Sequence, residues 1–318
     1  LGSRGLGDVY KRQGLHNPGF VGGLGAVAAA GLMRGLSLDQ LCNAFGIAAA
    51  LLPVCPFVSF VEGADTKDLY GGWGVHLAMF AVDAAQRGLT GAEHVLDGIK
   101  SLSTVFQGDA GKEIAFGKPY LINWLSIKQY PACFAVNPAV NAAFALQEKY
   151  NIDTAEIESV LVDSYPYSYD LNNGVGRNPN TTSGRLSLYY TVAVALIERS
   201  LTPDAFTAEK LKDPKYAELR GKITAKRHDA YGDGPKGIRA CIVEVHMKDG
   251  RVYQMEYNAT DVHVVYSDEM LYEKYCGLTR DALAPDQQKS LYDYAMAVAR
   301  QEDLSYLLNA MRALPKIG

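Results

Sequence analysis

Apolar residues follow two different patterns in the two halves of the chain. Between residues 22 and 102, small and apolar residues recur at helical spacing. Residues 24–33 are apolar on all sides, which predicts a buried helix whose small residues let neighbouring helices approach closely. A second long helix is predicted for residues 74–87. The first part of the chain is therefore expected to be helical.

Two short patterns indicate where further helices begin. Ser37 and Gln40 have the spacing of a capping box and predict a helix that runs to about Leu52. Thr90 and Glu93 have the same spacing and predict a short helix after Gly88.

The pattern becomes mixed after about residue 122. Alternating apolar residues at 157–163 predict a strand. Two apolar runs around Asp249 and Gly250 predict a β-hairpin with a type I′ turn. Helices are predicted at 137–149 and 187–198, and helical spacing returns after residue 267 with acidic residues at two helix starts.

These patterns predict an α+β protein with a mostly helical, discontinuous domain and a smaller inserted α+β lid. The helical domain is expected at 14–122 and again at 266–318, with the lid at 123–265. Residues 8–13 match the translation of GATGTGTATAAGAGACAG, a transposon adapter end used in sequencing libraries. We expect 1–13 to be an assembly scar and the natural helical domain to begin upstream.

Composition excludes several classes of protein. The chain has 318 residues, a net charge of −4 and mixed basic and acidic residues, so neither nucleic-acid binding nor a membrane span is expected. Its five cysteines include no C-x-x-C pair, which argues against a zinc knuckle or a disulfide framework. We expect a cytoplasmic protein without a metal or other cofactor.

A glycine pattern at residues 23–28 matches G-x-G-x-x-A, the fingerprint of dinucleotide binding. No hydrophobic strand precedes it, and Asp39, the next acidic residue, falls at a helix start. Close helix packing is therefore the favoured interpretation of these glycines.

Four side chains are candidates for chemistry. His16 lies between glycines and before Pro18, a setting that suits an acid or base more than those of the other histidines do. Lys67 precedes a glycine pair that leads into a helix, where it can bind an anion, although Asp65 or Asp68 can neutralise it. Lys128 lies beside Tyr130 and can hold a carboxylate.

Cys133 is the fourth candidate, and its simpler interpretation is a small buried side chain. A cysteine hydrolase that uses Cys133 requires a histidine near its sulfur. The sequence places no histidine beside it.

Taken together, these segments resemble the MmgE/PrpD family. The resemblance rests on Gly-Leu-His16-Asn-Pro, Ala-Asp-Thr-Lys67, Lys128-x-Tyr-Pro-Ala-Cys133 and the helix after Ser187, and it runs from about Gly14 to Met311. The family includes 2-methylcitrate dehydratase, cis-aconitate decarboxylase and an iminodisuccinate epimerase. It implies the helical domain with an inserted lid described above, and a homodimer.

The resemblance also assigns site residues. It implies that His16 is the histidine of the family's G-F-H segment, with Leu15 in place of Phe, and that Lys67 and Lys128 are its active-site lysines. Cys133 stands where the animal decarboxylase has histidine and many bacterial members have cysteine, which weakens the decarboxylase interpretation. The family's further aspartate and histidine lie upstream of His16, so the chain as given is expected to be weakly active or inactive.

These residues suit proton removal beside a carboxylate of a di- or tricarboxylic acid. The first hypothesis is a 2-methylcitrate dehydratase-like hydro-lyase, and decarboxylation or epimerisation are its alternatives because both share the enolate-like step. A carboxylate-binding protein without activity is the alternative from another class, and it would tolerate His16→Gln. The loop at residues 165–182 is expected to shape specificity because of its position and composition.

Overall fold

The computed structural model describes residues 14–106, 120, 122, 127–172, 175, 180–232, 237–260 and 266–313. The expected scar and the two expected lid boundaries at 123 and 265 lie outside these residues. The chain divides into two compact units, residues 1–260 and 261–318. The α+β class is confirmed: helices predominate, and one four-stranded sheet is present in the described residues.

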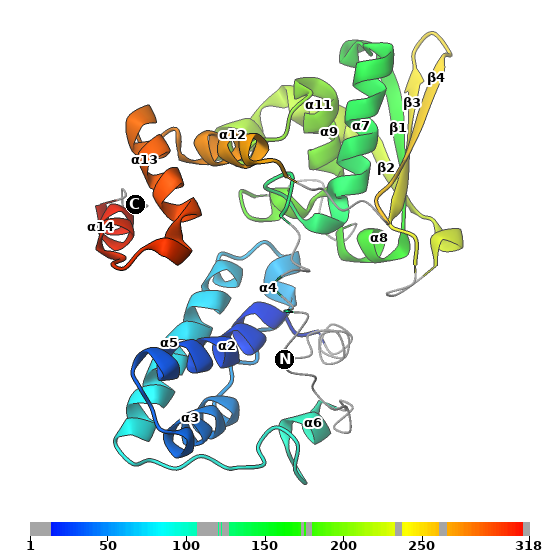
Figure 1. Cartoon of the computed structure of the whole chain (residues 1–318). Helices are drawn as coiled ribbons and strands as arrows, with labels where there is room; N and C mark the ends of the chain where they lie inside the picture. The colour runs from blue at the N-terminus through cyan, green and yellow to red at the C-terminus, as the bar shows by residue number, and fades with distance from the viewer. Residues whose placement is uncertain are drawn as a thin grey trace. The chain divides into compact units, whose positions relative to one another are not determined.

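The first helices form a layer of their own. Figure 1 shows α2 (Asn17–Met33), α3 (Leu38–Ala50) and α5 (Thr66–Gln86) side by side. They bury a core of alanine, valine, leucine and isoleucine side chains. The predicted capping box is present, since Ser37 Oγ accepts from Gln40 N at 3.2 Å and Gln40 Oε1 accepts from Ser37 N at 3.0 Å. Two short helices, α4 (Val58–Val61) and α6 (Leu102–Val105), complete this part.

Glycines set the distance between α2 and α5. A Cβ on Gly23 would lie 3.2 Å from Gly74 O, and a Cβ on Gly74 would lie 2.7 Å from Gly19 O. Backbone therefore meets backbone at this crossing. Residues 23–28 fall inside α2, so close helix packing, and not a dinucleotide fingerprint, is the confirmed interpretation.

Two helix predictions need correction here. No helix forms after Gly88, because residues 93–100 make a series of turns. Gly91 lies against α3, where its N donates to Asn43 Oδ1 at 3.1 Å and a Cβ would lie 2.5 Å from Asn43 O. The second error concerns α5, which begins at Thr66 and continues through the glycine pair, so Lys67 lies in its first turn instead of before it.

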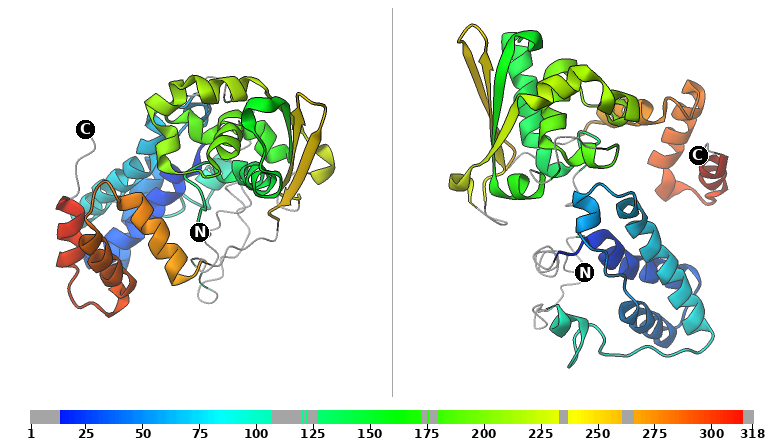
Figure 2. Two further views of the ribbon diagram at one scale, coloured as in Figure 1. Left: turned by 90° about the horizontal axis from the view of Figure 1, so that it is seen from above. Right: turned by 180° about the vertical axis from the view of Figure 1, so that it is seen from behind.

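A mixed sheet carries the α+β part. Its order is β2-β1-β3-β4, with β1 (Ile157–Ser164) parallel to β2 (Ile223–Arg227) and antiparallel to β3 (Ala240–Met247), which pairs with β4 (Val252–Asn258). The helices α7 (Asn137–Tyr150) and α9 (Leu188–Glu198) share one apolar core with β1 and β3, and both views show them beside the sheet (Figures 1 and 2). The shorter helices are α8 (Pro166–Asn172), α10 (Ala208–Lys212) and α11 (Pro214–Gly221).

The predicted hairpin is confirmed, but its turn type is wrong. Gly250 N donates to Met247 O at 3.0 Å, and Gly250 has a φ of +85° whereas Asp249 does not have a positive φ. A type I′ turn needs positive φ at both central residues. The loop is therefore a three-residue connection, a type I turn followed by a left-handed glycine.

The second unit contains helices throughout its described residues. These are α12 (Asp268–Thr279), α13 (Pro285–Met296) and α14 (Ser305–Ala313). Ser267 Oγ caps α12 by accepting from Met270 N at 3.2 Å. The helical character expected after residue 267 is confirmed, and its return to the first helical domain stays a prediction.

Candidate active site

His16 is fixed at the start of α2. Its N donates to Cys55 O at 2.8 Å, and Leu15 forms a bridge with Pro56, so the loop around residue 55 holds the residues that precede the helix. Pro18 then occupies the first turn of α2, where no amide donor is needed. The imidazole lies among aromatic rings: its centroid is 5.1 Å from that of Phe60, in a stacked arrangement, and 5.7 Å from that of Phe57.

Lys67 approaches the same ring from α5. Its Nζ is 5.6 Å from the Phe60 centroid and 2.5 Å from Asp68 Oδ1, and 20% of its side chain is exposed. An ammonium at this distance from a ring is held weakly by the ring's quadrupole. Of the two acids that can neutralise it, Asp68 pairs with Lys67, whereas Asp65 accepts a hydrogen bond from Thr182.

Phe60 also connects these two residues to the α+β part of the chain, which is the expected lid. It belongs to a small buried cluster with Val175 and Leu186, against which Phe57 and Cys133 pack. His16, Lys67 and Cys133 are thus gathered around one apolar cluster, although they lie far apart in sequence. Cys133 is held there by its backbone, since its N donates to Arg185 O at 2.7 Å.

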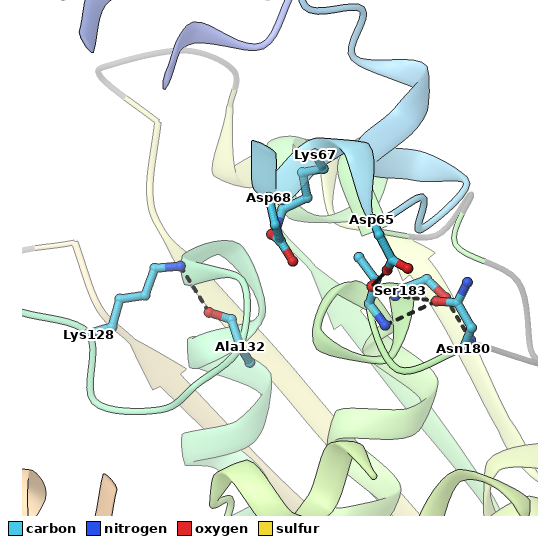
Figure 3. A network of polar contacts seen from close by, with 8 residues as sticks. Asp65, Lys67, Asp68, Lys128, Ala132, Asn180 and Ser183 are labelled. Atoms are coloured by element: carbon cyan, nitrogen blue, oxygen red, sulfur yellow. Dashed lines mark hydrogen bonds and ion pairs between the residues drawn. The ribbon is translucent and has the colours of Figure 1, made fainter. Parts of the chain in front are cut away.

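Lys128 lies on the chain segment that leads to Cys133. Its Nζ donates to Ala132 O at 3.1 Å, and the residue is exposed. Figure 3 shows the Lys128 side chain directed towards this carbonyl, in one view with Lys67 and Asp68. The structure therefore places Lys128 on the lid and Lys67 on α5.

Polar contacts join the two parts directly, and sequence patterns indicate them only weakly. Asn180 Nδ2 donates to Gly63 O at 3.0 Å, and Thr182 Oγ1 donates to Asp65 Oδ1 at 2.7 Å. Figure 3 shows Asp65 beside Asn180 and Ser183. The expected specificity loop at 165–182 lies partly outside the described residues, and its last residues make these contacts. The available signal was a run of Asn, Thr and Ser, which favours side-chain to backbone hydrogen bonds.

Burial keeps two nearby groups protonated. It raises the pKa of the Cys55 thiol, which lies beneath α2 where a Cβ on Gly19 would be 2.6 Å from its Sγ. It also raises the pKa of Tyr165 well above its ordinary value, and the nearby Cys133 raises it further. Both groups therefore remain neutral at physiological pH and can donate a hydrogen bond but carry no negative charge.

Two kinds of feature are absent from the described part of the chain. No helix there is both long and apolar enough to cross a membrane. No group of three or more histidine, cysteine, aspartate or glutamate side chains there is arranged to hold a metal ion. The expectations of a cofactor-free, cytoplasmic protein stay predictions.

Comparison with known protein families covers both parts of this site. The MmgE/PrpD N-terminal domain matches residues 5–115, which include His16 and Lys67, and the MmgE/PrpD C-terminal domain matches residues 130–298, which include Cys133. The chain belongs to the MmgE/PrpD family. The resemblance seen in the sequence is thereby confirmed, and Lys128 lies between the two matched regions.

One curated relative carries a functional name. The chain is 29% identical over 153 residues to a protein from Yarrowia lipolytica (strain CLIB 122 / E 150) called "2-methylcitrate dehydratase, mitochondrial". The match covers 45% of this chain and 29% of that relative. The MmgE/PrpD family includes dehydratases, so membership supports a lyase-type enzyme at the level of the family.

Proposed function

We propose that this MmgE/PrpD protein is a cofactor-free lyase for a di- or tricarboxylic acid, with 2-methylcitrate dehydration as the first candidate reaction. The observation that carries the proposal is the meeting of His16 and Lys67 on Phe60, in the cluster that also receives Cys133 from the lid. An acid-base group and a cation on one apolar surface suit a reaction that develops negative charge on a carboxylate.

The ion pair of Lys67 supports a route for substrate binding. Lys67 is paired with Asp68, whose side chain is 52% exposed. Exposed ion pairs contribute only about 0–1 kcal/mol, so a substrate carboxylate can replace Asp68 at little cost. We assign a second substrate carboxylate to Lys128, whose present acceptor is the carbonyl of Ala132.

The proposed reaction then uses each group once. Removal of the proton from the carbon beside a carboxylate places negative charge on that carboxylate, where the lysine ammonium groups stabilise it. The bond from the neighbouring carbon to its hydroxyl breaks, the electron pair leaves with oxygen, and the hydroxide gains a proton to become water. His16 transfers a proton at the reacting carbon or at the leaving hydroxyl. Cys133 remains a candidate catalytic residue beside them.

The alternatives differ in the bond that breaks. In a decarboxylase the bond to a carboxylate breaks, carbon dioxide leaves and the carbon gains a proton. In an epimerase the proton returns to the opposite face. Proton NMR in deuterated buffer with 2-methylcitrate, citrate, cis-aconitate and iminodisuccinate distinguishes these reactions by loss of water, loss of carbon dioxide or deuterium uptake alone.

Two variants test whether the assigned residues act. Lys67→Ala and His16→Gln should each lower kcat/KM by about a hundredfold or more, in the range for loss of an acid-base or charge-stabilising group. A protein that only binds carboxylates would lose affinity in Lys67→Ala and keep it in His16→Gln. Unchanged turnover in both variants would refute the site. We also propose a homodimer, which sedimentation equilibrium tests.

A further inference from the structure

The turn that precedes Lys67 is held by the lid. Lys67 N donates to Ala64 O at 3.1 Å and Asp68 N donates to Asp65 O at 2.9 Å, so α5 begins directly from residues 63–65. A shift of this turn therefore shifts Lys67 and its ion pair with Asp68.

Two side-chain hydrogen bonds from the lid fix the turn. Asn180 Nδ2 reaches Gly63 O at 3.0 Å, and Thr182 Oγ1 reaches Asp65 Oδ1 at 2.7 Å. The second bond has an ionised acceptor, and such bonds are shorter and stronger than bonds between neutral groups. Because the two bonds hold residues 63 and 65 separately, they fix both the position and the direction of the turn.

The lid side of this contact is rigid. Asn180 Oδ1 accepts from Thr182 N at 3.1 Å and from Ser183 N at 2.7 Å, while Ser183 Oγ accepts from Asn180 N at 2.9 Å. Thr182 and Ser183 are both buried. The amide of Asn180 is thus held by its own loop, with its Nδ2 left to donate to Gly63 O.

The fit between the two turns leaves no room for a side chain at residue 63. Gly63 has a φ of +70°, and a Cβ there would lie 2.4 Å from Ser183 Cβ and 2.7 Å from Asn180 Oδ1. Both the left-handed backbone and the close approach require glycine. This contact is therefore a close backbone junction and not a chance meeting of surface side chains.

We infer that Asn180 and Thr182 are positioning residues that hold Lys67 in register with Lys128 and Cys133. Lys67 is carried by α5, whereas Lys128 and Cys133 are carried by the lid, so one carboxylic acid can meet all three only if the two parts keep a fixed relation. The catalytic part of this inference rests on the proposed function. The positioning of Lys67 itself does not.

The test uses Asn180→Ser and Thr182→Val together. Serine keeps a hydroxyl that can cap the 180–183 turn but is too short to reach Gly63 O, and valine removes the hydroxyl of threonine while keeping its shape. Neither change alters charge. The single variant Thr182→Ser keeps a hydroxyl at residue 182 and the Asn180 amide, and it serves as the control.

The first readout is the rate at which an acetylating reagent modifies Lys67 in the folded protein, resolved by mass spectrometry. We expect this rate to rise at least about threefold in the double variant, as Lys67 leaves its partly buried position beside Phe60 and Asp68. The rate at Lys128 should stay unchanged, and the Thr182→Ser variant should behave as the original protein. An unchanged Lys67 rate in the folded double variant overturns the inference.

The second readout is kcat/KM for 2-methylcitrate, which should fall by about tenfold in the double variant because misplaced groups lose transition-state stabilisation. In a Lys67→Ala background the same double variant should cause no further loss, because it acts through Lys67. A further tenfold loss there would overturn the role in catalysis. If Lys67 becomes more reactive but no acid is turned over by the original protein, the positioning role stands and the proposed function fails.

Discussion

Replacement of Gly74 by alanine tests the helix crossing on which the candidate site is built. A Cβ at residue 74 would lie 2.7 Å from Gly19 O and 3.1 Å from Gly23 N. Both neighbours are backbone atoms of α2, so no change of rotamer can relieve the contact, and the two helices must separate. Overpacking of this kind costs about 1–3 kcal/mol.

Gly72→Ala is the matched control on the same helix. A Cβ at Gly72 meets nothing within 4 Å. Both variants gain the same helix propensity, about 0.8–1 kcal/mol. The difference between them therefore isolates the steric cost, and we expect Gly74→Ala to be less stable than Gly72→Ala by about 1–3 kcal/mol.

The assay is urea unfolding followed by circular dichroism, with the two variants and the original protein compared at one temperature. Gly72→Ala should unfold at a higher urea concentration than the original protein, and Gly74→Ala at a lower one. Because α2 begins beside His16 and α5 carries Lys67, kcat/KM should also fall in Gly74→Ala alone. Equal stability of the two alanine variants would refute this account of the crossing.

Three further changes have defined outcomes. Gly250→Ala should lower the free energy of unfolding by about 1 kcal/mol, and Gly250→Asn by less, because the cost comes only from placing a side chain on a left-handed backbone, which asparagine tolerates better than alanine. Urea titration checks both. Asp68→Asn should tighten citrate binding about two- to fivefold in calorimetry by removing the acid that competes for Lys67, and weaker binding would contradict this. Tyr216 donates to Glu198 at 2.5 Å and lowers the pKa of that carboxyl, and lysines lower it further. The resulting stabilisation is present above the ordinary pKa of glutamate and is lost as pH falls through the lowered value. Glu198→Gln should therefore make the free energy of unfolding depend less on pH in the acid range.

Much of the fold was predictable because local signals agreed with the packing. The capping box at Ser37 and Gln40 formed as expected, and the alternation at 157–163 produced β1. The helix predicted at Thr90 and Glu93 failed because the backbone around Gly91 is held against α3. A local pattern cannot report such a tertiary contact.

The pattern of apolar residues also failed to predict strand β2 and the type of the turn at Gly250. β2 was missed because it lies at the sheet edge and only its first residue is buried, so its apolar alternation is weak. The turn at Gly250 was assigned to the wrong type because Asp-Gly is compatible with several loops, and the register of β3 and β4 decides between them.

The candidate site was predictable as a set of residues but not as an arrangement. The sequence settings of His16, Lys67 and Cys133 make them candidates, and the structure has His16 and Lys67 beside Phe60 and Cys133 packed against the cluster that contains Phe60. The structure adds two features that the sequence does not indicate. These are the role of Phe60 and the contacts of Asn180 and Thr182 with residues 63–65. The contacts join segments 117 positions apart, and no short motif encodes that distance.

The most direct test of the proposed lyase is proton NMR of 2-methylcitrate in deuterated buffer with the original protein and with Lys67→Ala. The account predicts loss of water from 2-methylcitrate with the original protein and none with Lys67→Ala. Equal rates in the two proteins would contradict the central role of Lys67. Deuterium uptake without loss of water would contradict dehydration and support the epimerase alternative.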